Sequence, residues 1–231
     1  MSSGASLNFA RGTVHQSRSN GQAIIRWVSR LYVGLIVFVI GAMLIHNAFD
    51  FRAKISGRSV AHIESYFTRG EIAQHVLLLS SFVILVLTGF ALKWPDSIFG
   101  ILVPLTETYR RWIHRGSGVV MIALAIYHVG YLVLTRRGRT LVAGFRPRLA
   151  DASAALNTFL FNAGFKPRKP EEQFPGYVEK AEYWALIWGT IIMAVTGVLL
   201  WYENLTLRFL PLWALNLFTA VHFYEAILAT L

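Results

Sequence analysis

Five of the seven histidines lie within or at the ends of long apolar runs, where an ionisable side chain is costly and therefore points to a function. These five are His46, His75, His114, His128 and His222. Imidazole is a common axial ligand of haem iron. The chain contains no cysteine, which excludes disulfides, zinc–thiolate sites, iron–sulfur clusters and covalently attached haem within it. Any metal within the chain must therefore be held by His, Met or carboxylates.

Two of the histidines share one apolar run at a helical spacing. His114 and His128 are 14 residues apart, which is about 21 Å of helix at roughly 1.5 Å per residue and close to four turns. Both would lie on nearly the same helix face, one toward each membrane surface, so one helix could offer a ligand to each of two stacked haems. The alternative is that both are interfacial or helix-packing histidines that hydrogen bond to neighbouring helices.

An internal repeat relates two parts of the chain in one ungapped register, with an offset of 108 residues from His114 to His222. The matched identities are Glu71, Ala73, Leu78, Ile84, Thr88, Gly89, Leu92 and His114 with Glu179, Ala181, Leu186, Ile192, Thr196, Gly197, Leu200 and His222. The repeat makes His114 and His222 the favoured axial pair. Gly89 and Gly197 would let a helix or a porphyrin approach closely.

The repeat leaves the ligands of a second haem open. The counterpart of His75 is Tyr183, and the counterpart of His128 would fall at position 236, beyond Leu231. A second haem could therefore use His75 with either His128 or a residue past Leu231. Because the last apolar run ends without a cap or a basic flank, the sequence leaves open whether the native chain continues.

Other charged and polar residues near the spans have two readings each. Arg110, Arg111 and Arg115 could pair with haem propionates, since Arg binds carboxylates through a planar fork, or could anchor the helix at the interface. His46 could bind a haem, line a quinone headgroup site, or form an interfacial polar cap. Glu225, three residues after His222, could support that ligand or carry protons, or could be a buried packing acid.

The elements that must position these residues are membrane-spanning helices. The 231-residue chain is 55% hydrophobic and only 15% charged, which is too apolar for an ordinary soluble domain. Five segments suit a span of about 20 residues, at about 24–49, 72–92, 112–135, 183–202 and 212–231. We expect an all-α integral membrane protein, in which a four-helix haem-binding bundle is joined by one additional N-terminal helix. Residues 1–23 should be a flexible polar tail, and residues 136–182 a basic extramembrane loop.

The positive charges predict orientation rather than nucleic-acid binding. The net charge is +10, but the Lys and Arg residues lie between apolar runs, as in membrane anchoring. More of them fall in the first and third loops, which should be cytoplasmic, with the N-terminus periplasmic. Membrane lipids are therefore expected partners, and nucleic acid is not.

Three motifs resemble a known family. Glu-Ile-Ala-Gln-His at 71–75, Thr-Gly-Phe at 88–90 and Arg-Trp-Ile-His-Arg-Gly at 111–116 are similar to the membrane cytochrome b subunits of formate dehydrogenase, thiosulfate reductase and nickel-iron hydrogenase. The likeness is strongest to cytochrome b modules paired with multihaem c-type cytochromes, whose extra first helix also ends in a His-Asn motif like His46-Asn47. It extends over about residues 31–231.

The resemblance implies a dihaem b-type cytochrome of the bacterial cytoplasmic (inner) membrane. Such a subunit passes electrons between the quinone pool and a periplasmic redox partner, such as a multihaem cytochrome c. By the family pattern, His114 and His222 hold the haem nearer the periplasm. His75 holds the haem nearer the cytoplasm, with a second histidine late in the last helix that this sequence lacks, so whether His128 serves instead is open.

Two other functions fit an apolar chain with intramembrane His and Glu. One is a proton-relaying transporter, and the other is a haem-free membrane anchor for a partner enzyme. A transporter of broken helices should show Gly or Pro interruptions within its spans, whereas the prolines here lie in loops or at helix ends. Neither alternative requires two histidines 14 residues apart with a repeat-related mate.

Overall fold

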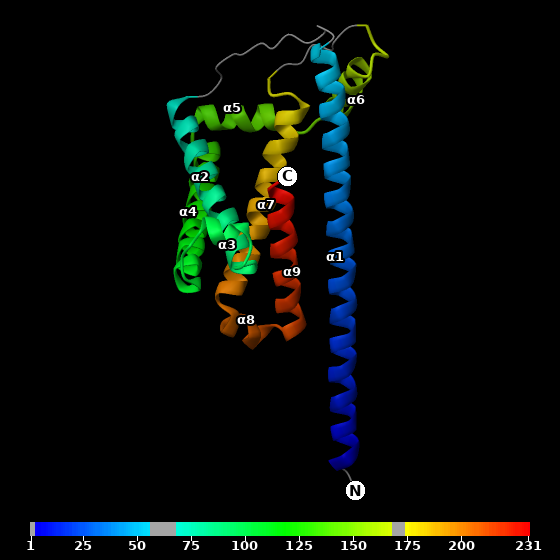
Figure 1. Cartoon of the computed structure of the whole chain (residues 1–231), viewed down its shortest axis with the longest axis vertical. Helices are drawn as coiled ribbons and strands as arrows, with labels where there is room; N and C mark the ends of the chain where they lie inside the picture. Colours follow the sequence, from blue (N-terminus) through cyan, green and yellow to red (C-terminus); the bar gives the residue numbers. More distant parts are fainter. Residues whose placement is uncertain (1–2, 56–67, 168–173) are drawn as a thin grey trace. The chain divides into compact units, whose positions relative to one another are not determined.

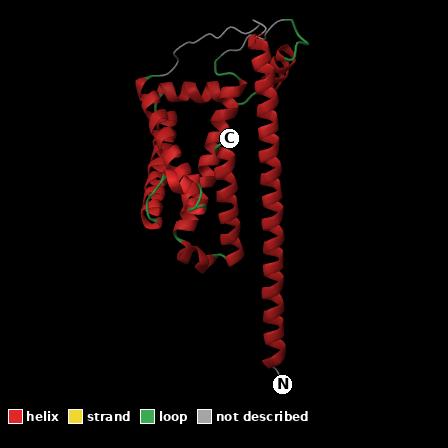
Figure 2. Ribbon diagram, in the orientation of Figure 1, coloured by secondary structure: helices red, strands yellow, loops and turns green. Residues whose placement is uncertain are grey.

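The computed structural model describes residues 3–55, 68–167 and 174–231, with side chains described from residue 20 onward except at 53 and 54. Every regular element in these ranges is an α-helix, and none of the described residues forms a strand (Figure 2). The all-α class predicted from the sequence is therefore confirmed.

Five helices in the described ranges are long and apolar enough to cross a membrane. They are α1 (Ser3–Ile55), α2 (Arg69–Lys93), α4 (Glu107–Leu134), α7 (Tyr177–Trp201) and α9 (Leu212–Ala229). The five predicted spans are confirmed, and most of these helices extend past the predicted bounds by a turn or more. The arrangement of four of them as one haem-binding bundle stays a prediction.

Four shorter helices lie between the spans: α3 (Ile98–Leu102), α5 (Arg136–Phe145), α6 (Leu149–Asn162) and α8 (Glu203–Phe209). The segment 136–182, expected to be a loop, thus contains two helices, which Pro147 separates. Helix α5 forms because its arginines and its apolar residues recur at helical spacing, which gives it one polar and one apolar side. Figure 1 shows α5 lying across the ends of α2 and α4 at a steep angle to both.

Residues 1–23 were expected to form a flexible polar tail, but residues 3–23 belong to helix α1. It begins at Ser3 and runs without a break into the apolar stretch that starts at Asn20. The first proline of the chain is Pro95. No residue before it therefore removes a backbone donor or clashes with the preceding turn, so the helix of the span can extend through the polar segment.

Helix α2, which carries several candidate residues, is fixed at both ends by its sequence. At its start, the Glu71 backbone N–H donates to Thr68 Oγ1 at 3.3 Å, and the Thr68 N–H donates to Glu71 Oε2 at 2.7 Å. This reciprocal pair is a capping box. The helix ends at Lys93, before Pro95. A Cβ at Gly100 in α3 would lie 1.7 Å from the Pro95 carbonyl oxygen, so only glycine fits this return turn.

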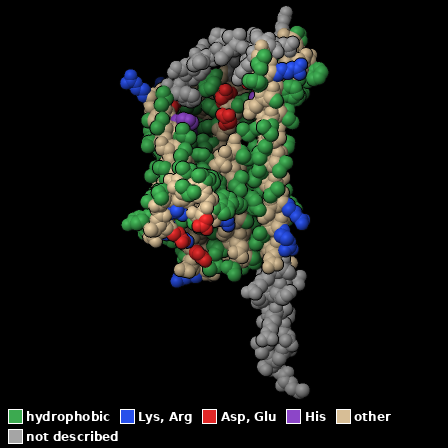
Figure 3. All heavy atoms as spheres, viewed as in Figure 1, with side chains coloured by type: hydrophobic (Ala, Val, Ile, Leu, Met, Phe, Trp, Pro, Cys, Tyr) green, Lys and Arg blue, Asp and Glu red, His purple; other side chains and the backbone are tan. Residues whose placement is uncertain are grey.

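The spans present apolar side chains outward. Phe38, Ile126 and Leu134 are 70%, 69% and 80% exposed, and hydrophobic side chains cover most of the face drawn in Figure 3. The buried residues of the spans are instead mostly small or polar, among them Ser81, Thr88, Ala91, Thr196 and Glu225. This distribution suits lipid as the solvent, because helix contacts in a membrane depend on close packing and hydrogen bonds.

The chain divides into two compact units. One contains residues 1–42 and 191–231, and the other contains residues 43–190. Helices α1 and α7 each contribute to both units. The second unit holds the α2–α4 hairpin with α5, whereas the first holds the end of α7 with α8 and α9.

Candidate functional site

The His114 side chain of α4 is held by a threonine on α2. Thr88 Oγ1 lies 3.1 Å from His114 Nδ1 and 2.6 Å from the carbonyl oxygen of Ile84. A hydroxyl carries one proton, and Thr88 donates it to the Ile84 carbonyl. The Thr88 oxygen therefore accepts the hydrogen bond from His114, which places the imidazole proton on Nδ1.

This tautomer prepares His114 for metal coordination. With the proton on Nδ1, the lone pair of the ring lies on Nε2, the atom that commonly binds iron. A hydrogen bond on the other nitrogen fixes the ring orientation and raises the basicity of the ligand, as seen around metal-bound histidines generally. Thr88 is 3% exposed, so this bond is shielded from competing water.

The residue after the threonine leaves room for the ring. A Cβ placed on Gly89 would lie 3.1 Å from His114 Cε1, closer than ordinary van der Waals contact. Alanine at this position would require the imidazole to shift by a few tenths of an ångström, and a larger side chain would require more. Glycine therefore allows the close approach of α2 to the histidine ring.

The same arrangement of threonine, histidine and glycine recurs in the other unit, at the position that the sequence repeat predicts. Thr196 Oγ1 lies 2.8 Å from His222 Nδ1 and donates to the Ile192 carbonyl oxygen at 2.7 Å. A Cβ on Gly197 would lie 3.3 Å from His222 Cε1. His222 thus has the same tautomer, with its lone pair on Nε2. Two copies with the same bonds indicate one shared chemical requirement.

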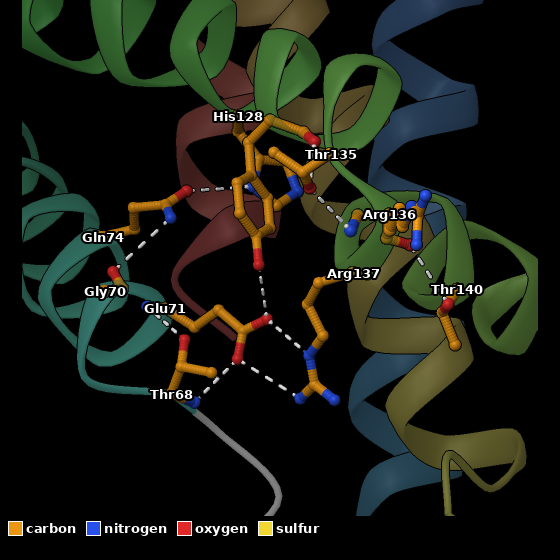
Figure 4. A network of polar contacts seen from close by, with 11 residues as sticks. Thr68, Gly70, Glu71, Gln74, His128, Thr135, Arg136, Arg137 and Thr140 are labelled. Atoms are coloured by element: carbon orange, nitrogen blue, oxygen red, sulfur yellow. Dashed lines mark hydrogen bonds and ion pairs between the residues drawn. The ribbon is translucent and has the colours of Figure 1, made fainter.

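His128, at the other end of α4, is held differently, by hydrogen bonds at both ring nitrogens. Its Nδ1 lies 3.2 Å from Gln74 Oε1 on α2, and its Nε2 lies 3.1 Å from the Tyr183 hydroxyl on α7. Figure 4 shows His128 and Gln74 facing each other across the helices. The sequence proposed His128 as a metal ligand, and in this arrangement its Nε2 is engaged by a tyrosine.

A second polar set lies one turn nearer the ends of these helices. The Tyr131 hydroxyl donates to Glu71 Oε1 at 3.0 Å, and Arg137 Nε donates to the same oxygen at 3.2 Å (Figure 4). The hydrogen bond to the Glu71 carboxylate raises the pKa of the Arg137 guanidinium above its usual value. This set ties the start of α2 to the end of α4 and to α5.

The comparison with family models decides the class of the protein. The model described as prokaryotic cytochrome b561 matches residues 66–231, which is more than half of the chain. The chain belongs to this family. It is therefore a multi-pass membrane cytochrome of the b type, whose function is haem-based electron transfer. No curated protein and no solved structure matches the chain. Helix α1 lies outside the matched residues.

The donor set of the cytochrome fits haem better than a bare metal ion. Within the described ranges, no three His, Cys, Asp or Glu side chains converge on one point. A porphyrin supplies four of the ligands of its iron, so the protein must add only one or two. Single histidines with a fixed tautomer, each beside a glycine, meet that need.

Arg110 of the cytochrome has a structural role. It is 9% exposed, and its guanidinium donates to the carbonyl oxygens of Val103, Ala91 and Gly100 at 3.0, 2.9 and 3.1 Å. These bonds hold the connection between α2 and α4, which contains α3, against α4. The binding of Arg110 to a haem propionate stays a prediction.

The neighbouring arginines lie nearer the solvent. Arg111 is exposed and forms an ion pair with Glu107 one turn earlier on α4. Arg115 is partly exposed. Their pairing with propionates also stays a prediction.

The remaining candidates pair with tyrosines or lie exposed. Glu225 is 7% exposed and accepts a hydrogen bond from the Tyr32 hydroxyl at 2.9 Å. His46 Nε2 lies 3.3 Å from the Tyr177 hydroxyl. His75 is exposed on α2. The roles of Glu225, His46 and His75 stay predictions.

Sequence reasoning did not assign roles to Gln74, Tyr131 and Tyr183. The helix register could have found the first two, because α2 and α4 are antiparallel. Each step back along α2 from Thr88 corresponds to an equal step forward along α4 from His114. The same register pairs Gln74 with His128 and Glu71 with Tyr131. The repeat singled out Tyr183 only as the counterpart of His75, and it did not relate Tyr183 to His128.

Proposed function

We propose that this cytochrome is a dihaem electron carrier between the quinone pool and a periplasmic redox partner, such as a multihaem c-type cytochrome. The observation that carries the proposal is the arrangement of threonine, histidine and glycine built twice, at His114 and at His222. Each copy supplies a neutral imidazole of fixed tautomer beside a glycine.

His114 and His222 would hold one b-type haem between them, because they are equivalent in the sequence repeat. The chain itself does three things for such a haem. Thr88 and Thr196 keep the proton on Nδ1 of each histidine, so that Nε2 can bind iron. The glycines leave the rings room, and the threonines fix their orientation. When bound by two histidines, haem iron is six-coordinate and suited to electron transfer rather than to oxygen chemistry.

His75 is the candidate ligand for a second haem. The sequence left His128 or a residue past Leu231 as its mate. The hydrogen bonds at both ring nitrogens of His128 favour another role for that residue.

The composition indicates that the chain needs a separate redox partner, and the charges indicate its orientation in the membrane. The chain has no cysteine and no nicotinamide or flavin motif, so another protein or quinone must supply or accept the electrons. The excess of Lys and Arg in the first and third loops supports a cytoplasmic position for those loops and a periplasmic N-terminus.

A haem count with matched variants tests the proposal. Pyridine haemochrome analysis of the purified protein should give two b-type haems per chain. His114→Gly and His222→Gly should each remove one haem, the double variant should remove no more than either single variant, and added imidazole should restore it. A protein without haem would overturn the function. A double variant that loses both haems would overturn the pairing.

A further inference from the structure

We propose that Gln74, His128 and Tyr183 bind the headgroup of a quinone or hydroquinone, with His128 as the proton acceptor. The inference rests on the proposed function, since it names the site at which quinone would exchange electrons with this cytochrome. Each residue comes from a different helix of the same unit, α2, α4 and α7.

The hydrogen bonds fix the protonation of the three residues. Gln74 Nε2 donates to the Gly70 carbonyl oxygen at 3.4 Å, so Gln74 Oε1 is the atom that faces His128. His128 must then donate from Nδ1 and keep its lone pair on Nε2. That lone pair accepts the hydrogen bond from the Tyr183 hydroxyl. The result is a neutral base beside a hydroxyl donor, which is the pair that a hydroquinone oxygen requires.

All three residues lie at the same depth in the helices. Gln74 is five residues after the start of α2, Tyr183 is six after the start of α7, and His128 is six before the end of α4. Each is therefore about 8 to 9 Å inside its helix end. A quinone bound at this depth can keep its polar ring just below the interface and its apolar tail among the lipid chains.

Aromatic rings line one side of the polar residues. The centroid of the Phe145 ring, at the end of α5, lies 4.7 Å from the centroid of the Tyr183 ring. The centroid of the Trp184 ring lies 6.2 Å from that of Tyr183. Trp184 Nε1 donates to the Phe145 carbonyl oxygen at 3.0 Å, which holds α5 against α7. Flat aromatic surfaces beside hydrogen-bonding groups suit a flat, amphipathic ring.

Polar side chains lie between His128 and the helix ends, where protons must leave the site. Tyr131 and Glu71 lie one turn nearer the helix ends, and Glu71 pairs with the exposed Arg137. Histidine and acidic side chains also gather in Figure 3 near the ends of α2 and α7 that adjoin α5, in contrast to the apolar spans. His128 and Tyr183 are themselves half-buried, so part of each side chain is accessible.

The proposed reaction is the two-electron oxidation of a hydroquinone to a quinone. A hydroquinone displaces the Tyr183 hydroxyl from His128 Nε2, and the hydroquinone O–H donates to that nitrogen. The hydroquinone loses two protons and two electrons and becomes quinone. His128 accepts the protons one after the other and passes each to water at the membrane surface. The two electrons would be accepted one at a time by a haem that the histidines of the chain hold. Tyr183 then donates to the new quinone carbonyl oxygen.

Three variants of the haem-loaded protein test the site: His128→Asn, Tyr183→Phe, and Tyr127→Phe as the control. Tyr127 is 59% exposed on the same helix as His128. The probes are a short-chain ubiquinone and a short-chain menaquinone, and their binding is measured by quenching of tryptophan fluorescence. The signal from the site is the part that Trp184→Phe removes.

We expect His128→Asn and Tyr183→Phe to weaken the binding of at least one probe by roughly tenfold, the effect of losing one good hydrogen bond. Both variants should keep the wild-type haem count and the wild-type rate of reduction by dithionite, and both should be reduced more slowly by the hydroquinone. Tyr127→Phe should match the wild type.

Two results would overturn the site. Loss of a haem in His128→Asn would make this residue an axial ligand, and unchanged binding in both variants would make the cluster a helix-packing network. Absence of haem from the wild type is a separate outcome, since it would refute the proposed function while quinone binding could still be measured. Tyr183→Phe keeps the aromatic ring, so it tests the hydroxyl even if His128→Asn does not fold.

Discussion

The two ends of α4 hold their histidines in different ways. At the first end, the threonine hydroxyl of Thr88 orients His114 through Nδ1, and a glycine leaves the ring room. At the other end, an amide and a phenol engage both nitrogens of His128. The same side chain with the same tautomer is thus prepared for different partners. In our proposal, the group facing Nε2, rather than the histidine itself, distinguishes an iron ligand from a proton acceptor.

The largest expected effect comes from filling the space beside His114. In Gly89→Val, the new side chain should displace the imidazole, because even a Cβ would lie 3.1 Å from its Cε1. We expect loss of the haem that we propose for His114, measured as haem per chain. Gly34→Val on α1 is the control, since no atom lies within 4 Å of a Cβ at that position. Full haem retention in Gly89→Val would mean that the glycine serves helix packing alone.

Two neighbouring arginines at the His114 end of α4 are anchored differently. Arg110 is buried, and its removal would leave three carbonyl oxygens without their donor. We expect Arg110→Ala to lower the free energy of unfolding by about 3 kcal/mol, measured by denaturation in detergent. Arg111→Ala should change it by less than about 0.5 kcal/mol, because that ion pair is exposed. Equal effects of the two variants would contradict the structural role of Arg110.

The threonine at the His114 end should have a moderate effect. Thr88→Val removes the acceptor for Nδ1–H, and the loss of such a supporting bond weakens metal binding by roughly tenfold or more. The histidine also becomes a poorer electron donor, so the midpoint potential of the haem should rise. Thr88→Ser should restore both properties.

The control for Thr88→Val is Thr219→Val on α9. Thr219 Oγ1 also donates to a carbonyl oxygen of its own helix, that of Leu215, at 3.0 Å. It therefore matches Thr88 in its backbone contact but not in its histidine. If both valine variants shifted the potential alike, the effect would belong to the helix backbone and not to the ligand.

The sequence predicted the spans and one end of α4 better than the other. Span length and apolar composition locate the membrane helices, and the repeat linked Thr88 and Gly89 to the histidine at position 114 before any contact was known. The neighbours of His128 were harder to predict, because the faces by which helices meet depend on their rotation. Helices that are apolar on all sides carry no stripe that reports this rotation. The backbone contacts of Arg110 were not predicted for a related reason, since the sequence does not indicate which carbonyl groups an arginine will reach.

The smallest expected effect lies at the His128 end. Glu71 accepts hydrogen bonds from the Thr68 N–H and the Tyr131 hydroxyl as well as from Arg137. Arg137→Gln should therefore lower the thermal unfolding temperature only slightly at low salt, and the difference should vanish at about 1 M salt, where exposed charges are screened. Glu71→Gln should cost more, because it weakens all three bonds at the start of α2. A loss in Arg137→Gln as large as that in Arg110→Ala would mean that both ends of α4 are fixed equally firmly, and that rigidity does not distinguish the two histidines.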